Sequence, residues 1–310
     1  MAPRPKVSDE ELAELIRQVG VNTAAARLGM NARSLAKRRA KLEARIDRPV
    51  RRFEMAAHHP ERLHAEIDSG CIVIGSDAHY WPQIVSTAHR AFVRFIKEMK
   101  PAMVVMNGDA FDGAGVSRHP RMDYAEIPSV KDELEAVRDR LAEIQAAAGK
   151  ARLVWPIGNH DERFEGRLAH VAPEYAGTLP SLKDHFPHWE PCYAIWVNDA
   201  VVIMHRWKGG AHATHNNAAQ SGKSVFTGHL HSQKVTPWTD YNGTRYGVDS
   251  GVLAAPYGPQ FKYMRDMPRN WRSGFAVATF DKGRLLLPEL VHVLDETAGE
   301  VEWRGKVYTV

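Results

Sequence analysis

Cysteine and long apolar runs are what this sequence has least of. Only two of its 310 residues are cysteines, Cys71 and Cys192, and neither belongs to a Cys-x-x-Cys pair. A disulfide framework and a thiolate zinc site are therefore disfavoured. No apolar run approaches the roughly 20 residues that a membrane helix needs, and Met1 to Lys6 lack the apolar stretch of a secretory signal. We expect a cytoplasmic location and no membrane partner.

Low-complexity tracts are also missing, and the composition is that of a soluble globular protein, with 44% hydrophobic and 25% charged residues. The length suits one large domain and a small one. Positive charge is concentrated at one end: residues 1–55 carry a net charge of +6, although the whole chain carries only +4. This asymmetry favours an anionic partner for the N-terminal segment.

Residues 8–46 predict a three-helix domain of the helix-turn-helix type. Ser8 and Glu11 form a capping-box pattern that begins the first helix. Gly20 is expected to end it, and Asn22 to cap a short second helix up to Leu28. A tight turn at Gly29 leads to a third, basic helix that ends near Ile46.

The small Ala25, four residues before Gly29, lets two helices touch, and Leu28 and Leu35 fill the core between them. This pattern resembles helix-turn-helix DNA-binding domains over about forty residues. The resemblance predicts that residues 1–48 bind DNA through cations of the last helix. The candidate DNA-binding residues are Arg33, Lys37, Arg38, Arg39 and Lys41. A small helical hairpin used for docking or oligomerisation is the alternative.

Residues 49–70 are interpreted as a linker, with a short helix at 61–67, and residues 71–310 as the main domain. From Cys71 onward, short apolar runs predict buried strands. These runs are 71–74, 103–106, 153–157, 201–204 and 224–226. Helical patterns at 84–99 and 130–148 separate the first three, which predicts an α/β layered core. The turn Asp281-Lys282-Gly283 predicts a hairpin between 275–280 and 284–287.

Each of the five predicted strands is followed at once by residue types that bind metal ions. These strand-end clusters are Asp77 and His79; Asp109 and Asp112; Asn159, His160 and Asp161; His205; and His229 and His231. Open α/β sheets place their sites at the carboxyl ends of strands. Side chains that span more than 150 residues of sequence are therefore expected to converge.

Each cluster alone has an ordinary explanation. Asp-x-His suits a solvated loop, Gly-Asp and Asn-His-Asp suit polar turns, and a lone histidine after an apolar strand is more often a satisfied core residue. Five such clusters, each directly after an apolar strand, are hard to explain in this way, so we interpret them together as one metal site.

The order of these motifs resembles that of the calcineurin-like metallophosphoesterases, over about residues 71–295. The resemblance implies a β-sandwich flanked by helices, with two divalent metal ions at one end. One metal would take Asp77, His79, Asp109 and His231; the other would take Asp109, Asn159, His205 and His229. Asp109 would bridge the pair, as two-metal phosphotransfer sites require. Mixed nitrogen and oxygen ligands favour Mn, with Fe, Zn or Ni as alternatives.

The resemblance also implies a mechanism, in which a water held between the metals attacks phosphorus in line. His160 would protonate the leaving oxygen or steady the transition state. Asp161 is the natural partner to orient His160, and Asp112 is expected to support the ligand shell around Asp109 without binding metal.

The fourth motif departs from the family pattern, because Arg206 and Trp207 follow His205 where the family has glycine. His212 and His215 lie close behind in sequence and are alternative ligands. We favour His205, since it directly ends an apolar strand. Arg206 is a candidate for binding the substrate phosphate, and a surface salt bridge is the equally plausible alternative.

Two features favour a nucleic-acid substrate: the basic N-terminal segment, and residues 256–272, where aromatic and cationic residues interleave. A surface loop whose aromatics pack on the core explains the second feature equally well. Our hypothesis is a phosphodiesterase or nuclease brought to DNA by its N-terminal domain. The alternatives are a phosphatase acting on a nucleotide, a small phosphoester or a phosphoprotein, and an inactive DNA-binding regulator.

Overall fold

In the computed structural model, the chain forms two compact units, Met1–His59 and Pro60–Val310. The structure describes residues 7–46, 59–117, 127–175, 178 and 180–310. The part of the predicted linker at 49–58 lies outside the described residues. From Pro60 onward, the predicted linker belongs to the large unit, where strand β1 (Leu63–Ala65) pairs in parallel with β6 (Ala194–Val197). The short helix predicted at 61–67 is therefore wrong. His64 is exposed between less exposed neighbours, which is the period of a strand.

The small unit contains two helices in its described part, α1 (Asp9–Leu28) and α2 (Ala32–Ile46). The predicted capping box is present, since Glu11 N donates to Ser8 Oγ and Ser8 N donates to Glu11 Oε2. Gly29 ends α1 with a left-handed φ of 60°, and Asn31 Oδ1 accepts from Arg33 N at the start of α2.

The predicted three-helix arrangement is wrong, because α1 continues through Gly20. A glycine inside a helix costs only about 1 kcal/mol, and tertiary packing outweighs that cost. Apolar side chains from both ends of α1 are buried in one core with two leucines of α2: Leu12, Ile16, Ala24, Ala25, Leu35 and Leu42. The unit is a two-helix hairpin over the residues described.

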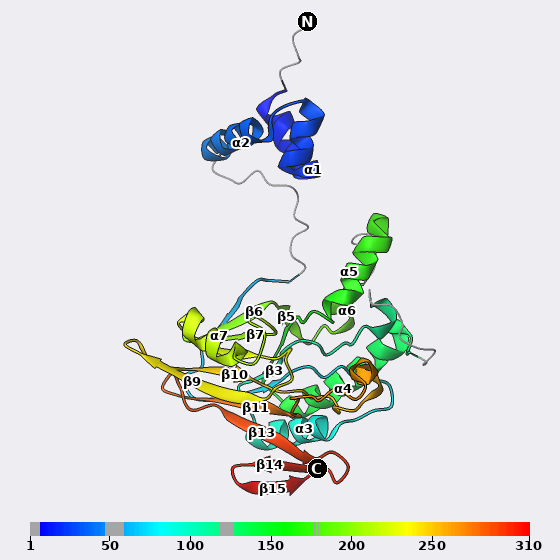
Figure 1. Ribbon diagram of the computed structural model, residues 1–310, viewed down its shortest axis with the longest axis vertical. Coiled ribbons are helices and arrows are strands. Elements are labelled where there is room, and N and C mark those ends of the chain that lie inside the picture. Colours follow the sequence, from blue (N-terminus) through cyan, green and yellow to red (C-terminus); the bar gives the residue numbers. More distant parts are fainter. Residues whose placement is uncertain (1–6, 47–58, 118–126, 176–177, 179) are drawn as a thin grey trace, which may run out of the picture. The chain divides into compact units, whose positions relative to one another are not determined.

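A nine-stranded sheet forms the centre of the large unit (Figure 1). Its strands are β2 (Gly70–Gly75), β3 (Met103–Met106), β4 (Arg152–Pro156), β5 (Glu190–Cys192), β11 (Gly274–Asp281), β12 (Arg284–Leu285), β13 (Glu289–Asp295), β14 (Glu300–Trp303) and β15 (Lys306–Thr309). The order is β15-β14-β13-β11-β2-β3-β4-β5, with β12 paired to β11. Strands β2 to β5 are parallel, and β11 runs antiparallel to β2.

A second sheet of six strands has the order β1-β6-β7-β8-β10-β9. Its remaining strands are β7 (Val201–Met204), β8 (Ser224–Thr227), β9 (Lys234–Asp240) and β10 (Gly243–Asp249). Strands β7, β8 and β10 are parallel neighbours, so their carboxyl ends lie along one edge.

The strands of the nine-stranded sheet are apolar on both faces, and successive residues divide between two cores. Ile72 and Ile74 of β2 pack with Ile203 and Phe226 of the second sheet. Val73, between them, packs on the opposite face, which helices cover. The two sheets therefore form a sandwich with one core between them and a second core under the helices.

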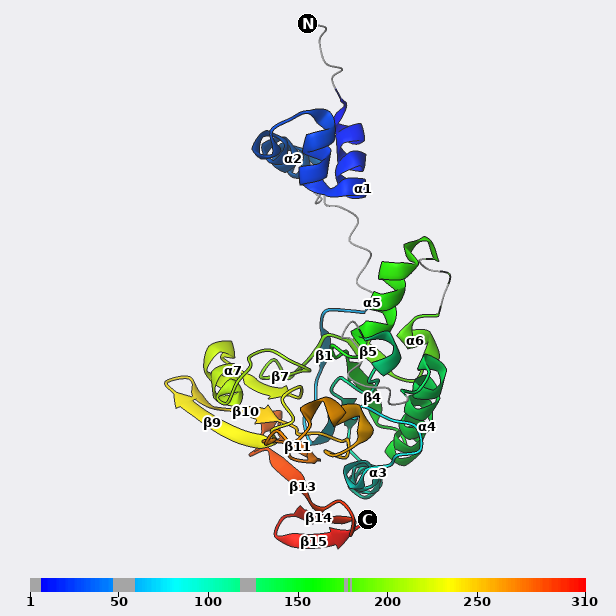
Figure 2. The same cartoon turned by 45° about the vertical axis from the view of Figure 1, so that its right-hand side comes forward.

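Helices α3 (Thr87–Met99) and α4 (Val130–Ala148) lie side by side on the outer face of the nine-stranded sheet (Figures 1 and 2). The shorter helices are α5 (Glu162–Val171), α6 (Leu182–His185) and α7 (Ala213–Ser221), and α7 packs on the second sheet. Short 3-10 helices are η1 (Ala114–Val116), η2 (Pro173–Tyr175) and η3 (Pro259–Met264). None of the helices that the structure describes combines the length and apolarity of a bilayer-crossing segment.

The predicted α/β layered fold, a β-sandwich flanked by helices, is confirmed for the large unit. All five predicted strands are present, as β2, β3, β4, β7 and β8. The hairpin β11–β12 turns at Lys282 and Gly283, which both have positive φ as its tight turn requires. Helix α3 begins at Thr87 and not at Ile84, because Ser86 provides its N-cap.

Candidate metal centre

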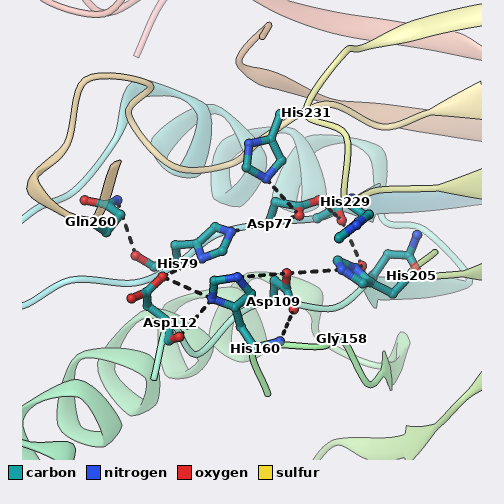
Figure 3. A network of polar contacts seen from close by, with 12 residues as sticks. Asp77, His79, Asp109, Asp112, Gly158, His160, His205, His229, His231 and Gln260 are labelled. Atoms are coloured by element: carbon teal, nitrogen blue, oxygen red, sulfur yellow. Dashed lines mark hydrogen bonds and ion pairs between the residues drawn. The ribbon is translucent and has the colours of Figure 1, made fainter. Parts of the chain in front are cut away.

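The loops that follow the five predicted strands meet at one rim of the sandwich, where their side chains point toward one another (Figure 3). Backbone hydrogen bonds join these loops: Asp77 N donates to Gly108 O at 2.9 Å, and Gly228 N donates to His205 O at 2.9 Å. The expected convergence is therefore observed. It follows from the parallel order of β2, β3 and β4 in one sheet and of β7 and β8 in the other.

On one side of the centre, Asp77, His79 and His231 offer ligand atoms that all lie within 4.8 Å of one another. All three residues are buried. His231 Nε2 lies 3.0 Å from Asp77 Oδ1, and His79 Nε2 lies 4.0 Å from the same oxygen. This group contains three of the four residues that the resemblance implies for one metal.

On the other side, Asp109, His205 and His229 form a second group with the same spacing. His205 Nε2 lies 3.1 Å from Asp109 Oδ2. Asp109 also belongs to a third group, with His79 and His160. Its carboxylate therefore lies between the two sides of the centre, where a bridging ligand is needed.

Each buried ligand histidine donates from one ring nitrogen and leaves the other without a hydrogen-bond partner. His79 Nδ1 donates to Asp112 Oδ1 at 2.9 Å, His205 Nδ1 donates to Asn107 O at 2.8 Å, and His231 Nε2 donates to Asp77. The remaining nitrogens, His79 Nε2, His205 Nε2 and His231 Nδ1, are unpartnered. For His79 and His205 this is the pattern of metal-ligating histidines, in which an outer hydrogen bond fixes the tautomer and the ring. His231 instead contacts Asp77, another expected ligand.

The amide oxygen of Asn159 is also buried without a partner. A buried polar atom without a hydrogen bond costs about 1–3 kcal/mol. The three histidines and Asn159 therefore each have one buried atom without a hydrogen bond that could bind a metal ion. The donor set therefore fits divalent cations.

Backbone strain is concentrated in the same residues. Non-glycine residues seldom adopt the left-handed region, yet five of the expected ligands have positive φ: Asp77 (54°), His79 (40°), Asp109 (53°), His229 (68°) and His231 (58°). Such strain persists where the surrounding structure enforces it, and it gathers at functional sites. Here the left-handed backbone turns the side chains of Asp77 and His79, and of His229 and His231, toward the centre.

Two glycines of the motifs allow backbone to approach the carboxylates. A Cβ on Gly158 would lie 2.1 Å from Asp109 Oδ1, and a Cβ on Gly228 would lie 2.4 Å from Asp77 Oδ2. Any side chain at these positions would displace a ligand, so both glycines are required by close packing around the centre.

The charges of the centre are mutually compensating. Burial alone would raise the pKa of Asp77, but the charges of His231 and His205 outweigh it and lower the pKa to about 2. Burial also opposes ionisation of Asp109, and neighbouring histidines, above all His205, hold its pKa well below the usual range. Burial would lower the pKa of His205, but the charges of Asp109 and Asp77 raise it to about 10. Both aspartates therefore remain ionised and able to bind cations.

The ring of His160 lies at the edge of the centre, with Nε2 4.0 Å from Asp109 Oδ2. Its Nδ1 donates to Asp112 O at 2.9 Å and lies 3.3 Å from Asp112 Oδ1. Burial opposes protonation, but the hydrogen bond to Asp112 and the charges of Asp109 and Asp112 outweigh it and raise the pKa of His160. Asp112 thus contacts His79 and His160 beside Asp109, and its expected role in supporting the ligand shell around Asp109 stays a prediction.

The sequence assigned the orientation of His160 to Asp161, and the structure corrects this. The buried carboxylate of Asp161 accepts four N–H groups: Asp109 N and Gly158 N at 2.8 Å, and Phe111 N and Trp155 Nε1 at 3.0 Å. No hydrogen bond joins it to the His160 ring among the described residues. Asp161 therefore fixes the backbone of the Asp109 loop, and Asp112 orients His160.

The geometry of the fourth motif favours His205. His205 belongs to a ligand group, whereas His212 is exposed at the start of α7 and the His215 ring packs against Trp238 at 5.0 Å. Arg206 is half-exposed, and its guanidinium lies 3.9 Å from Glu162. Its expected contact with substrate stays a prediction.

Residues 256–272 contact the metal centre directly. The rings of Phe261 and Trp271 pack on His231, with centroids 5.7 and 4.5 Å away, and Phe261 also packs on His79 at 5.2 Å. Tyr257 and Tyr263 point outward, with 88% and 47% of their surface exposed. Two aromatics of this stretch therefore pack inward and two are exposed, and its expected contact with nucleic acid stays a prediction.

Sequence reasoning missed Asp249, which holds the His229–His231 loop in place. Asp249 Oδ2 accepts from Ser232 N and Ser232 Oγ, and Oδ1 accepts from Gly251 N. A signal was available, because Asp249 follows an apolar segment and ends β10, the parallel neighbour of β8. Arg163, whose guanidinium touches His160, was also missed.

The five predicted DNA-binding residues occupy two different environments on α2 of the small unit. Arg33, Lys37 and Lys41 are exposed and lie four residues apart, on one face of the helix. Arg38 instead binds Asp9 and the Val7 carbonyl, with Nη2 distances of 2.8 and 2.7 Å, and Arg39 Nε lies 3.5 Å from Glu43. Arg38 and Arg39 are therefore engaged within the small unit.

No family model matches this chain. The chain is similar to the Gene 54 protein of Mycobacterium phage L5, with 26% identity over 71% of this chain and 92% of that protein. It is similar to the Gene 54 protein of Mycobacterium phage D29 over the same shares of both chains, with 28% identity.

Among solved structures, the chain resembles zinc-complexed Vps29 from Entamoeba histolytica, with 14% identity, a TM-score of 0.39, and coverage of 77% of this chain and 98% of that one. A dimetal phosphatase from Danio rerio has 12% identity, a TM-score of 0.36 and coverage of 73% and 96%. The phosphoesterase YfcE from E. coli has 16% identity, a TM-score of 0.33 and coverage of 70% and 97%. Scores this low do not define an activity for this chain. Its own residues nevertheless place the five strand-end clusters at one rim of a helix-flanked β-sandwich.

Proposed function

We propose that this chain is a dinuclear metal-dependent phosphoester hydrolase. The observation that carries the proposal is the pair of ligand groups on either side of Asp109, with one group at Asp77 and the other at His205. Four buried ligand atoms that make no hydrogen bond support the proposal. Burying such polar atoms costs free energy unless a partner, here a cation, binds them. The complete ligand set also argues against an inactive regulator.

When bound, two divalent cations, Mn first among them, would activate a water and stabilise charge on the phosphate. The protein's own part is to hold the ligands rigidly. Asp161 and Asp249 fix the backbone of two ligand loops through five hydrogen bonds from backbone N–H groups. His160, held by Asp112, presents Nε2 toward the centre and would protonate the leaving oxygen.

Phosphodiesters of nucleic acid are the substrates that the surroundings favour. Phe261 and Trp271 attach residues 256–272 to the ligand histidines, so the exposed Tyr263 is held beside the centre. Lys262 and Arg265 flank it and are exposed. An aromatic ring between two cations suits stacking on a base and binding of its phosphates. We infer a phosphodiesterase or nuclease.

The test is turnover of a bis-aryl phosphate, a mono-aryl phosphate and plasmid DNA by the Mn-loaded protein, with and without EDTA. We expect EDTA-sensitive hydrolysis of the diester and nicking of the plasmid. Strong monoester turnover without DNA cleavage would replace the nuclease with a phosphatase. Absence of turnover on all three, in a protein that carries two metal ions, would reject the hydrolase.

We further propose that the small unit binds DNA through the exposed stripe of Arg33, Lys37 and Lys41. Their spacing aligns three cations on one helical face, which suits contact with successive phosphates. Deletion of residues 1–48 is expected to abolish salt-sensitive DNA binding and to spare turnover of a small substrate. Unchanged DNA affinity would assign binding to the large unit and leave the helical hairpin a docking or oligomerisation element.

A further inference from the structure

Arg163, in the first turn of α5, contacts His160, the side chain assigned to proton transfer, through its guanidinium. Arg163 Nη2 donates to His160 Nε2 at 2.9 Å, and Arg163 Nη1 donates to Asp112 O at 2.9 Å. The arginine stem packs on the loop that follows Asp112, since a Cβ on Gly113 would lie 3.1 Å from Arg163 Cδ. This packing directs the guanidinium toward the metal centre.

The charge of Arg163 has no carboxylate partner among the described residues. Its two acceptors, an imidazole nitrogen and a backbone carbonyl, are both neutral. Two other guanidinium groups of the large unit that are not exposed are paired with acids: Arg152 lies 2.6 Å from Glu190, and Arg245 contacts Asp240. A half-buried, unpaired cation beside a phosphoester site is suited to bind an anion.

We propose that Arg163 binds the non-bridging oxygens of the substrate phosphate, an inference that rests on the proposed function. A guanidinium carries five N–H donors, of which two are used here, so a fork remains for an anion. A phosphate is a stronger acceptor than either neutral partner. The guanidinium is therefore expected to turn from His160 to the phosphate when substrate binds.

This movement would also open His160 to the leaving group. Arginine only donates hydrogen bonds, so His160 Nε2 must act as an acceptor while Arg163 contacts it. In that state the nitrogen cannot offer a proton to a leaving oxygen. Withdrawal of Arg163 to the phosphate would free His160 Nε2 to take up a proton from solvent, which the imidazolium could then give to the leaving oxygen.

Arg206 is the residue that the sequence suggested for this contact. It differs from Arg163 in its exposure and in the charge of its partner. It is half-exposed, and a carboxylate, that of Glu162, lies 3.9 Å from its guanidinium. Arg163 is less exposed and has only neutral partners. The geometry therefore favours Arg163 as the principal phosphate contact from the protein.

The test compares Arg163→Gln and Arg163→Lys with Arg167→Gln, an exposed arginine one turn later on α5. Binding of orthophosphate to the full-length, Mn-loaded protein is measured by calorimetry, together with KM for a bis-aryl phosphate and the metal content. We expect Arg163→Gln to weaken orthophosphate binding by about tenfold or more and to raise KM similarly. Arg167→Gln is expected to match the wild type.

Arg163→Lys keeps the charge but loses the planar fork, so an intermediate affinity is expected. If Arg163→Gln does not fold, orthophosphate binding to Arg163→Lys tests the proposal instead. Wild-type orthophosphate affinity in a folded, metal-loaded variant would overturn the proposal, even if kcat fell, because Arg163 would then act only through His160. Failure of the proposed function would look different: the wild-type protein itself would lack two metal ions or turnover.

Discussion

The two units of this chain carry charge in opposite ways. In the large unit, Asp77 and Asp109 are almost fully buried among histidines, an arrangement that is costly unless the charges are paired or bind a cation. In the small unit, Arg33, Lys37 and Lys41 project into solvent, where charge costs little. The buried aspartates therefore indicate a specific kind of site, one that binds cations. The exposed cations of α2 indicate only an attraction to anions.

Replacing Asp109 with alanine should have the largest effect, because it removes the carboxylate shared by both ligand groups. We expect loss of bound metal and a fall in diester turnover of about 10³-fold or more. Metal analysis and steady-state kinetics measure both. A variant that retained two metal ions and wild-type turnover would show that buried charge does not mark the site here.

Glycine-to-alanine substitutions compare a position packed against the buried ligand Asp109 with an open position on α5. Gly158→Ala would place a Cβ 2.1 Å from Asp109 Oδ1, whereas a Cβ added to Gly166 on α5 would meet no heavy atom within 4 Å. We expect Gly158→Ala to weaken metal binding by about tenfold or more. Gly166→Ala should stabilise the fold by about 0.5–1 kcal/mol. Equal metal affinities in the two variants would contradict the close packing assigned to Gly158.

Proton release should distinguish the metal centre from any surface cation site. The pKa of His205 is raised to about 10, so its ring is protonated at neutral pH in the metal-free protein. A cation at Nε2 displaces this proton, so metal affinity should rise with pH. Below the pKa of His205, this group alone should contribute about a tenfold rise in affinity per pH unit. Calorimetry in buffers of different ionisation enthalpy measures the proton count. Binding without proton release near neutral pH would be inconsistent with His205 as a ligand.

The smallest effect is expected on the small unit. Neutral substitution of each of Arg33, Lys37 and Lys41 should lower the salt-dependence slope of DNA binding by about 0.9. Matched substitutions of Arg38 and Arg39 should leave the slope unchanged, because these side chains bind Asp9 and Glu43. Equal slopes for both sets of variants would remove the distinction between exposed and engaged cations.

The sequence was most informative where apolar strands end in polar residues. A buried parallel strand leaves a continuous apolar run, and its carboxyl end meets those of its neighbours, so the convergence of Asp77, Asp109 and His205 could be predicted. Strands such as β9 and β13 were missed, because partly exposed strands have no such run. The helix break at Gly20 was wrong because packing on both sides of it outweighs a weak local preference.

The supporting contacts of the site depend on how loops meet in space, which spacing along the chain does not specify. Asp161 follows His160 directly, yet its carboxylate reaches the backbone of Asp109 and Phe111. Arg163 stands in no motif, and only the structure shows it beside His160. The candidate ligands could therefore be read from the sequence, whereas the residues that position them could not.

Anomalous diffraction from crystals grown with Mn²⁺ tests the central claim most directly. Two peaks about 3.5–4 Å apart are expected, with the Asp109 carboxylate between them, His79 and His231 on one, and His205 and His229 on the other. A single peak, or two peaks that share no oxygen of Asp109, would contradict the dinuclear centre.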